Sequence, residues 1–546
     1  MTPHAPHTDA PVPVLIVGGS LVGLSTSLFL GRLGVPHLLV EKHPGTSLHP
    51  RGRGNNVRTM ELLRTAGVAD AVREAASVLA DNHGILQAHS LTSGDRGWLF
   101  KDIDPGGRLA RISPEGWCLC SQNDLEPVLL RAARDLGGDL RFSTEMTGFE
   151  QDAEGVTARL TDRATGRRYT VRAAYLVAAD GPRSPVREHL GIGQTGRGEL
   201  FHNVSITFRA KRLAEVVGAD RFIACYLTNP DAGGALLPVD NSEHWVFHAP
   251  WHPEHGEELA EFTDERCATH IRAATGVPDL EIDITGKAAW HAAERVAERY
   301  REGRVFLAGD SAHEMAPTGA FGSNTGIQDA HNLAWKLAAV LGGWAGPGLL
   351  ASYGAERRPV AVATSARAAA RSAEHSHPGY AAPPTTGRQS DVLAVALGYR
   401  YPHGAVVGAD PGQQPVPERF EPSGAPGCRA PHLWLLRAGV RISTLDLYER
   451  RCVLLTGAAG AAWHTAAGRA AARLAVPLDR YRVGDGPDAD LVPVPGADWA
   501  GAHGTAEDGA VLVRPDGFVA WRSCGAVADP EQALTAALSS VLSLGA

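Results

Sequence analysis

The segment between residues 13 and 41 constrains the fold of this chain more than any other feature of the sequence. An apolar run of strand length ends at Gly18, and apolar residues then recur at helical spacing up to Leu33. A second apolar run follows and ends at Glu41. This order predicts a βαβ unit whose helix N-terminus presents free backbone N–H groups to a pyrophosphate. We therefore expect a dinucleotide site here, with a purely structural glycine turn as the alternative.

The residues of this turn and the acid beyond it have separate roles in such a unit. Gly18 permits the tight turn, and Gly23 lets the helix pack closely on the strand. Ser20 stands where a second glycine is usual, and its small side chain still allows a pyrophosphate to approach. Glu41 ends the second strand, where a carboxylate can accept hydrogen bonds from both ribose hydroxyls, and Lys42 follows it.

The composition limits the class of protein. A length of 546 residues predicts three or four units at about 150 residues per domain. With 44% hydrophobic and 21% charged residues, the chain can bury the core of a soluble globular protein. A net charge of −8 without a basic patch argues against nucleic acid or a membrane surface as partner. No apolar stretch of about 18 residues and no signal peptide are evident, so we expect a cytoplasmic protein.

Cysteine, lysine and histidine patterns exclude other chemistries. The seven cysteines include one close pair, Cys118 and Cys120, whose C-x-C spacing predicts buried free thiols. None of the lysines is followed by Ser or Thr, which excludes a phosphate loop of the NTPase type. No Cys/His cluster has zinc-ligand spacing, so no metal is expected. His375 and His377 are interpreted as a solvated pair.

Two later motifs place polar residues at the ends of predicted strands. Residues 175–179 form an apolar run that ends at Asp180-Gly181. Residues 304–308 form another that ends at Gly309-Asp310, followed by a glycine-rich loop and a helix from residue 327. This second arrangement suits a carboxylate that binds a polyol hydroxyl, with backbone N–H groups nearby for a ring carbonyl or a phosphate.

Together the three motifs resemble the aromatic-ring hydroxylase family of FAD-dependent monooxygenases, which have the para-hydroxybenzoate hydroxylase fold. The resemblance covers nearly the whole chain. It implies that FAD contacts Gly18, Ser20, Gly23, Glu41, Lys42, Arg51, Gln122, Asp180, Gly181, Gly309, Asp310, Pro317, Gly322, Asn324 and Thr325.

Some residues depart from the family pattern or allow a second interpretation. The usual double glycine of the flavin loop reads Gly319-Ala320 here, which leaves the backbone path of the loop open. The resemblance places Arg51 over the mobile flavin as a catalytic residue. A surface salt bridge is the alternative for Arg51 and, with more weight, for Arg58.

The resemblance also implies the domain organisation. We expect an α/β chain with a Rossmann-like FAD-binding domain, an inserted mixed-sheet substrate domain and a C-terminal thioredoxin-like domain. The expected boundaries are a disordered tail at 1–11, the FAD-binding domain at 12–80, 110–190 and 285–400, the substrate-binding domain at 81–109 and 191–284, a linker at 401–428, and the thioredoxin-like domain at 429–546.

Within the family, the likeness is closest to hydroxylases of aromatic polyketides, of the aklavinone 11-hydroxylase type. It rests on residues 50–63, Gly116-Trp117 before Ser121-Gln122, residues 301–304 and residues 512–517. In the C-terminal unit, Cys452 and Cys524 belong to no C-x-x-C motif, which argues against redox activity of that unit.

The activity implied is hydroxylation of a polycyclic aromatic phenol, with FAD, NADPH or NADH, and O2, through a C4a-hydroperoxyflavin. Residues 200–289 alternate apolar and polar residues and should form the sheet above the substrate, where Tyr226 is a catalytic candidate or plain core. The partner is a small aromatic molecule, and the protein is a monomer or homodimer. Baeyer–Villiger oxygen insertion and a non-catalytic flavin-binding protein remain open.

Overall fold

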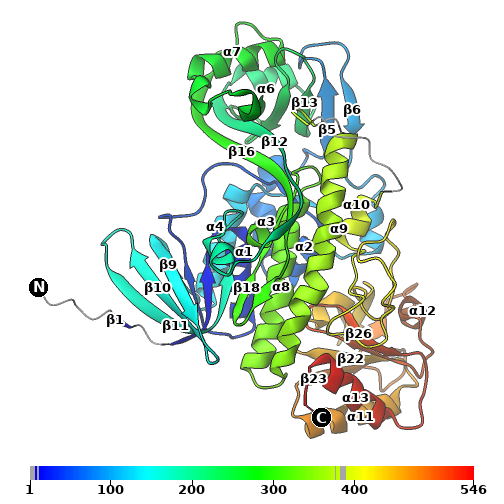
Figure 1. Cartoon of the computed structure of the whole chain (residues 1–546). Helices are drawn as coiled ribbons and strands as arrows, with labels where there is room; N and C mark the ends of the chain where they lie inside the picture. The colour runs from blue at the N-terminus through cyan, green and yellow to red at the C-terminus, as the bar shows by residue number, and fades with distance from the viewer. Residues whose placement is uncertain (1–6, 9–10, 376, 381–388, 546) are drawn as a thin grey trace, which may run out of the picture.

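The computed structural model describes residues 7–8, 11–375, 377–380 and 389–545. Figure 1 shows a central α/β body, a lobe above it and a C-terminal unit below. Most of the expected N-terminal tail lies outside the described residues. Within it, β1 (His7–Thr8) pairs in parallel with β11 (Arg168–Ala178).

The central body is built on a mostly parallel sheet of order β17-β18-β11-β2-β3-β8. The motifs identified in the sequence end three of its adjacent strands. The bounds are β2 (Val12–Val17), β3 (His37–Val40), β8 (Asp139–Arg141), β17 (Arg301–Glu302) and β18 (Val305–Leu307). Because β2, β11 and β18 run in parallel, the turns after them meet at one edge of the sheet. The Rossmann-like prediction is confirmed.

Helices bury the faces of this sheet, and an antiparallel ribbon extends it. α1 is apolar or small at nearly every position because it lies between the sheet and two other helices, α4 and α8. α8 and α9 are the long helices at the centre of Figure 1. The bounds are α1 (Leu21–Arg32), α4 (Gln122–Asp135), α8 (Phe321–Leu341), α9 (Ser352–Glu374), β9 (Thr144–Gln151) and β10 (Val156–Asp162).

The upper lobe is a mixed sheet of order β19-β16-β12-β15-β14-β13-β5-β6, so the predicted inserted sheet is confirmed. Its two longest strands, β12 and β16, run from the central body into the lobe (Figure 1). The bounds are β5 (Gly84–Ala88), β6 (Gly97–Phe100), β12 (Gln194–Arg209), β13 (Phe222–Leu227), β14 (Gly234–Pro238), β15 (His244–Trp251), β16 (Asp283–Ala297), β19 (His313–Glu314), α6 (Arg212–Val217) and α7 (Asp264–Thr275).

The C-terminal unit has a four-stranded sheet of order β23-β22-β25-β26 and a three-stranded sheet of order β21-β20-β24. The parallel pair β22–β23 and the antiparallel strands beside it agree with a thioredoxin-like domain, which stays a prediction. The bounds are β20 (Trp434–Arg437), β21 (Val440–Ser443), β22 (Cys452–Thr456), α11 (Ala461–Leu474), β23 (Leu478–Arg482), β24 (Val492–Pro493), α12 (Trp499–His503), β25 (Ala510–Val513), β26 (Val519–Ser523) and α13 (Pro530–Val541).

Shorter elements complete the chain. They are β4 (Gly54–Asn55), α2 (Val57–Thr65), α3 (Ala69–Ala75), β7 (Cys118–Leu119), α5 (Pro185–His189) and α10 (Val392–Ala396). No helix in the described part of the chain is long and apolar enough to cross a membrane. The cysteines are free thiols and, apart from the exposed Cys524, they are buried as predicted.

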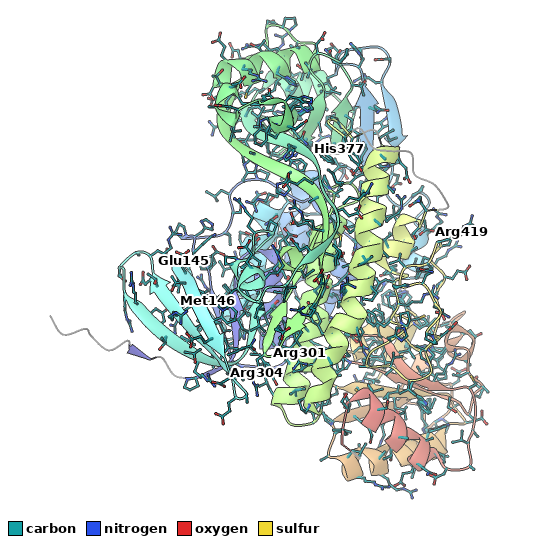
Figure 2. The ribbon with its side chains drawn as sticks, viewed as in Figure 1. Glu145, Met146, Arg301, Arg304, His377 and Arg419 are labelled. Carbon is teal, nitrogen blue, oxygen red and sulfur yellow. The ribbon has the colours of Figure 1, made fainter. Side chains whose placement is uncertain are left out.

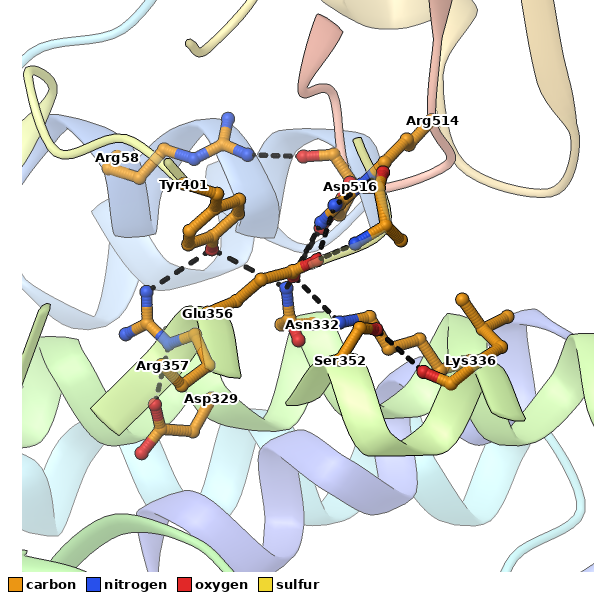
Figure 3. A network of polar contacts seen from close by, with 12 residues as sticks. Arg58, Asp329, Asn332, Lys336, Ser352, Glu356, Arg357, Tyr401, Arg514 and Asp516 are labelled. Carbon is orange, nitrogen blue, oxygen red and sulfur yellow. Dashed lines mark hydrogen bonds and ion pairs between the residues drawn. The ribbon is translucent and has the colours of Figure 1, made fainter. Parts of the chain in front are cut away.

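A buried network of charges joins α8 and α9 to the C-terminal unit (Figure 3). The carboxylate of Glu356 on α9 accepts hydrogen bonds from Lys336 Nζ at 2.7 Å, Asn332 Nδ2 at 2.8 Å and both terminal nitrogens of Arg514 at 2.7 and 2.9 Å. Arg514 also pairs with Asp516 in the turn between β25 and β26. These charged side chains are almost fully shielded from solvent, so each charge depends on its partners.

A second buried cluster joins α2 to the same turn. Glu61 binds Arg58 at 3.0 Å and Arg429 at 2.9 Å, and Arg58 Nη2 donates to the carbonyl of Asp516 at 2.6 Å. The alternative interpretation of Arg58 as part of a surface salt bridge is wrong, because Arg58 is only 3% exposed. The arginine connects two domains instead.

Glu356→Gln should strongly destabilise the protein, because it leaves Lys336 and Arg514 buried without their shared counter-charge. We expect the free energy of unfolding to fall by about 3–5 kcal/mol, measured by urea denaturation. Asp279→Asn is the control, since its pair with Arg212 lies on the surface, and it should leave the urea midpoint unchanged. Equal midpoints for the two variants would contradict this role of the network.

Candidate flavin site

The turn after β2 leaves no room for side chains at its two glycines. Gly18 has φ +108°, and a Cβ atom there would lie 2.1 Å from the carbonyl oxygen of Ala179. A Cβ at Gly23 would lie 1.8 Å from the carbonyl oxygen of Gly18. The helix that follows, α1, has no side-chain cap on its first N–H groups. The turn therefore has the shape and the free donors of an anion-binding helix start.

Two predicted side chains, Ser20 and Gln122, form a hydrogen-bonded group with Glu126 beside this turn. Ser20 Oγ donates to Glu126 at 2.6 Å, and Gln122 Nε2 donates to Ser20 Oγ at 2.9 Å and to Glu126 at 2.7 Å. Glu126 is fully buried and also accepts from the backbone of Ser47. The prediction missed Glu126, although its position four residues after Gln122 places both on one face of α4.

The carboxylate of Glu41 binds backbone N–H groups in the turn and just after β3. Its Oε2 accepts from the backbone N–H of Gly19 at 2.7 Å, and its Oε1 accepts from that of His43 at 2.8 Å. A Cβ at Gly19 would lie 2.7 Å from Glu41 Cβ, so this second glycine of the turn is also required for the fit. Lys42 is exposed.

Asp180 and Gly181 lie at the end of β11, next to the first turn. Asp180 Oδ2 accepts from the backbone of Val186 at 3.1 Å, whereas Oδ1 is buried without a hydrogen-bond partner among the described residues. Burial raises the pKa of this carboxyl. Gly181 has φ +85°, a backbone conformation that favours glycine.

Gly309 and Asp310 follow β18 and form the third turn at this edge. A Cβ at Gly309 would lie 2.5 Å from Val22 Cγ2, and one at Gly326 would lie 3.0 Å from Gly309 Cα. The turn, α1 and α8 therefore pack through small residues. Asp310 is exposed, yet the protein around it desolvates the carboxyl and raises its pKa. An accessible carboxylate inside a protein recess suits hydrogen bonding to a ligand hydroxyl.

The fully buried ion pair of Asp329 and Arg357 contacts the backbone of this turn. Asp329 on α8 binds His313 Nε2 at 2.8 Å and Arg357 Nε at 2.7 Å, and it accepts from the backbone N–H of Gly309 at 3.3 Å. The sequence motif gave no sign of this contact because the three side chains come from separate elements. They fix the backbone of Gly309 and therefore the position of its neighbour Asp310.

The glycine-rich loop before α8 is held by Asn324. Its Nδ2 donates to the carbonyl of Gly54 at 2.7 Å, and its Oδ1 accepts from the backbone of Asn56 at 2.9 Å. Ala320, which stands in place of a glycine, adopts φ +53° at the start of α8, so the left-handed path is kept despite the Cβ. Pro317 of the loop is exposed, and in the first turns of α8 Gly322 is partly exposed and Thr325 is buried.

Arg51 and Arg53 lie in different environments in the segment that Asn324 holds. Arg51 is exposed and close enough to Asp310 to lower the pKa of that carboxyl. Arg53 is buried and donates to the carbonyl of Pro238 at the end of β14. Burial lowers the pKa of Arg53 to about 10. Of the two arginines, only Arg51 was predicted as a site residue, whereas Arg53 contacts the upper sheet.

The face of the upper sheet that turns toward the flavin loop carries aromatic side chains. Tyr226 is 5% exposed, its hydroxyl lies close to Thr318 of that loop, and burial raises its pKa to about 12. His377 lies against Tyr226 and Phe201, with ring centroids 5.4 and 4.8 Å apart, where α9 meets the lobe (Figure 2). The interpretation of His377 as solvated is wrong, because it is 6% exposed and burial lowers its pKa to about 4.

Residues 11–368 match the FAD binding domain family, and residues 423–544 match the C-terminal region of the aromatic-ring hydroxylases. The chain belongs to the FAD-binding aromatic-ring hydroxylases. The resemblance inferred from the three motifs is thereby confirmed. The family match also supports FAD as the cofactor.

Relatives match over almost the whole chain. A putative polyketide hydroxylase of Streptomyces halstedii is 69% identical, with 98% of each chain covered. The aklavinone 12-hydroxylase RdmE of Streptomyces purpurascens is 40% identical over 98% of this chain and 99% of its own. A solved ternary complex of aklavinone-11 hydroxylase with FAD and aklavinone has a TM-score of 0.88 at 41% identity, covering 98% of this chain and 99% of the other.

The residues of this hydroxylase fit the flavin cofactor. The uncapped start of α1 offers backbone donors for a pyrophosphate. Asp310 is an accessible carboxylate without a hydrogen-bond partner in the described chain, and Asp180 Oδ1 is a buried orphan acceptor. The predicted contacts from three different strands thus meet at one edge of the sheet. Among the described residues, the group with metal-ligand geometry is His252, Glu254 and His255, which is exposed on the lobe.

Gly18→Ala should abolish retention of FAD, because the new Cβ would collide with the backbone of Ala179 in the phosphate-binding turn. Gly34→Ala is the matched control: Gly34 also has positive φ, +71°, but nothing lies within 4 Å of its Cβ position. Each variant carries the left-handed strain of about 1–2 kcal/mol, so their difference isolates the collision. Flavin absorbance per protein after purification measures the result, and equal flavin content in both variants would refute it.

The protein should lose stability in acid partly through His377. The unfolded chain binds a proton on this ring below pH about 6.5, whereas the folded chain does so only below about 4. Stability therefore falls as the pH drops across this window, by at most about 3 kcal/mol for this residue. His377→Gln should flatten the dependence of the unfolding free energy on pH between 6.5 and 4. An unchanged slope would show that the ring does not titrate as described.

Proposed function

We propose that this chain hydroxylates a polycyclic aromatic polyketide and consumes NADPH or NADH and O2. The observation that carries the proposal is the close match over the full length to aklavinone-11 hydroxylase, whose complex contains FAD and aklavinone. The aromatic character of the upper sheet supports it, since Phe201, Tyr226 and Trp290 provide flat apolar rings, a lining that suits a flat ligand.

The proposed roles of the site residues follow from their positions. The start of α1 would bind the pyrophosphate of FAD, and Glu41 would accept from the adenosine ribose. Asp310 would accept from the ribityl chain, and the loop that Asn324 holds would lie along the isoalloxazine ring. Bound and reduced, FAD supplies the electrons that activate dioxygen. The exposed Arg51 would lie beside the flavin and Asp310.

The protein's own contribution on the substrate side is positioning and the exclusion of water. Tyr226 stays protonated at neutral pH because its pKa is near 12, so it can act only as a neutral hydrogen-bonding group. His377 stays neutral for the opposite reason, since its pKa is near 4. Tyr226 and His377 would therefore contact an aromatic ring without adding charge of their own, and a dry site limits loss of reducing equivalents to peroxide.

The proposal is tested by anaerobic stopped-flow reduction of the purified flavoprotein with NADPH, with and without a hydroxyanthraquinone. We expect the ligand to accelerate flavin bleaching, because substrate-gated reduction prevents wasteful oxidation. Aerobic turnover should then give a product one oxygen atom heavier, with a new ring hydroxyl by NMR. NADH in place of NADPH gives the nucleotide preference.

Two results would overturn the proposal. A fast reduction that no aromatic ligand alters would argue for an oxidase. An ester or lactone carbonyl in the product would identify Baeyer–Villiger insertion in place of ring hydroxylation. Tyr226→Phe is an informative variant for product formation, because it removes the hydroxyl that contacts Thr318 and keeps the ring.

A further inference from the structure

A row of directly paired residues crosses the upper sheet from strand to strand. Ser205 on β12 pairs with His248 on β15, His248 pairs with Ala235 on β14, and Ala235 pairs with Tyr226 on β13. Directly paired residues project from the same face of a sheet. Ser205, His248 and Tyr226 therefore share a face, and the small Ala235 lies between the last two.

This face is the one turned toward the flavin loop. The neighbours one residue along in sequence, Val204 and Phe247, project to the other face and belong to the core under α6 and α7. On the face that carries the row, the Tyr226 hydroxyl lies close to Thr318 of the loop. Trp290 of β16 packs in one cluster with residues that flank the same loop. The row consequently forms part of the surface that would cover a substrate.

The hydrogen bond from Trp290 fixes the tautomer of His248. The indole Nε1 of Trp290 is 3.2 Å from His248 Nδ1. Indole N–H is a donor only, so Nδ1 must accept, and the proton of a neutral imidazole must then be on Nε2. Nε2 makes no hydrogen bond with other described residues. It is also absent from the fully buried atoms that lack a partner, and His248 itself is partly exposed. It is an N–H donor that remains available to a ligand.

The surroundings keep this imidazole neutral. His248 is only partly exposed, and desolvation by the protein around it is the main reason that its pKa falls to about 3. His377, Arg53 and His49 lie near enough to lower it further. His49 has a partner already, because its Nε2 is 2.9 Å from Ser205 Oγ. His248 is therefore a neutral imidazole whose free N–H donor is Nε2–H, because Nδ1 is held by Trp290.

We propose that His248 Nε2–H donates a hydrogen bond to a ring carbonyl oxygen of the substrate, and so selects quinone-type polycycles over carbonyl-free ones. The inference rests on the proposed function, and it adds a specificity residue that the sequence motifs did not indicate. A carbonyl oxygen only accepts, which complements a donor that cannot accept. A site built around such a bond discriminates against analogues that lack the acceptor.

The test compares two ligands on the FAD-loaded protein by titrating the flavin absorbance change. Danthron is a dihydroxyanthraquinone, and the dihydroxyanthracene with the same hydroxyl pattern lacks its carbonyl groups. His248→Phe keeps an aromatic ring but removes the donor, so we expect it to weaken danthron binding about tenfold and to leave binding of the anthracene unchanged. His248→Gln retains an N–H donor near Nε2 and should restore most of the preference for danthron.

His244→Phe is the control, since His244 lies on the same strand but binds Asp240, and it should leave both affinities unchanged. If His248→Phe weakens both ligands equally, or if the wild-type protein does not prefer danthron, the inference is wrong while the proposed function stands. If neither ligand binds or accelerates flavin reduction by NADPH, the proposed function fails and the inference fails with it.

Discussion

The buried carboxylate of Glu356 is the contact on which the arrangement of the domains depends. It neutralises Lys336 of α8 and Arg514 of the C-terminal unit at once, and Asn332 binds both Glu356 and Asp516. Removing one partner from such a group leaves a charge in a medium that cannot solvate it. The C-terminal unit is therefore joined to the long helix that begins at the flavin loop, although the unit itself contributes none of the predicted flavin contacts.

The same helix connects this network to the site. Asp329 lies on α8 one turn before Asn332, and it binds His313 and the backbone of Gly309. Arg357, next to Glu356 on α9, completes the connection by binding Asp329 and the hydroxyl of Tyr401. Polar contacts thus run from the turn of residues 514–517 to the turn that presents Asp310. The residues of this chain of contacts both stabilise the fold and fix the position of Asp310. Substitutions among them, even far from the flavin loop, should therefore alter both stability and site geometry.

The site itself combines accessible carboxylates below with neutral aromatic and imidazole groups above. Asp310 can accept hydrogen bonds from a polyol, whereas Tyr226 and His377 stay uncharged because burial penalises their ionised forms. A polar lower edge with the neutral Tyr226 and His377 above it suits a cofactor with a sugar-phosphate chain and a flat apolar substrate. The division follows from topology: parallel strands end at the lower edge, and the inserted sheet closes over it.

The sequence alone determined the βαβ unit, the three strand-end turns and the family, because turn chemistry and hydrophobic periodicity are local. Gly18 and Asp310 are recognisable without a structure for that reason. Only the tertiary structure decided the partners of residues far apart in the chain: the buried place of Arg58, the role of Glu126 beside Ser20, and the tautomer of His248. Burial and pairing over hundreds of residues set charge states and hydrogen-bond directions, and a linear pattern does not carry that information.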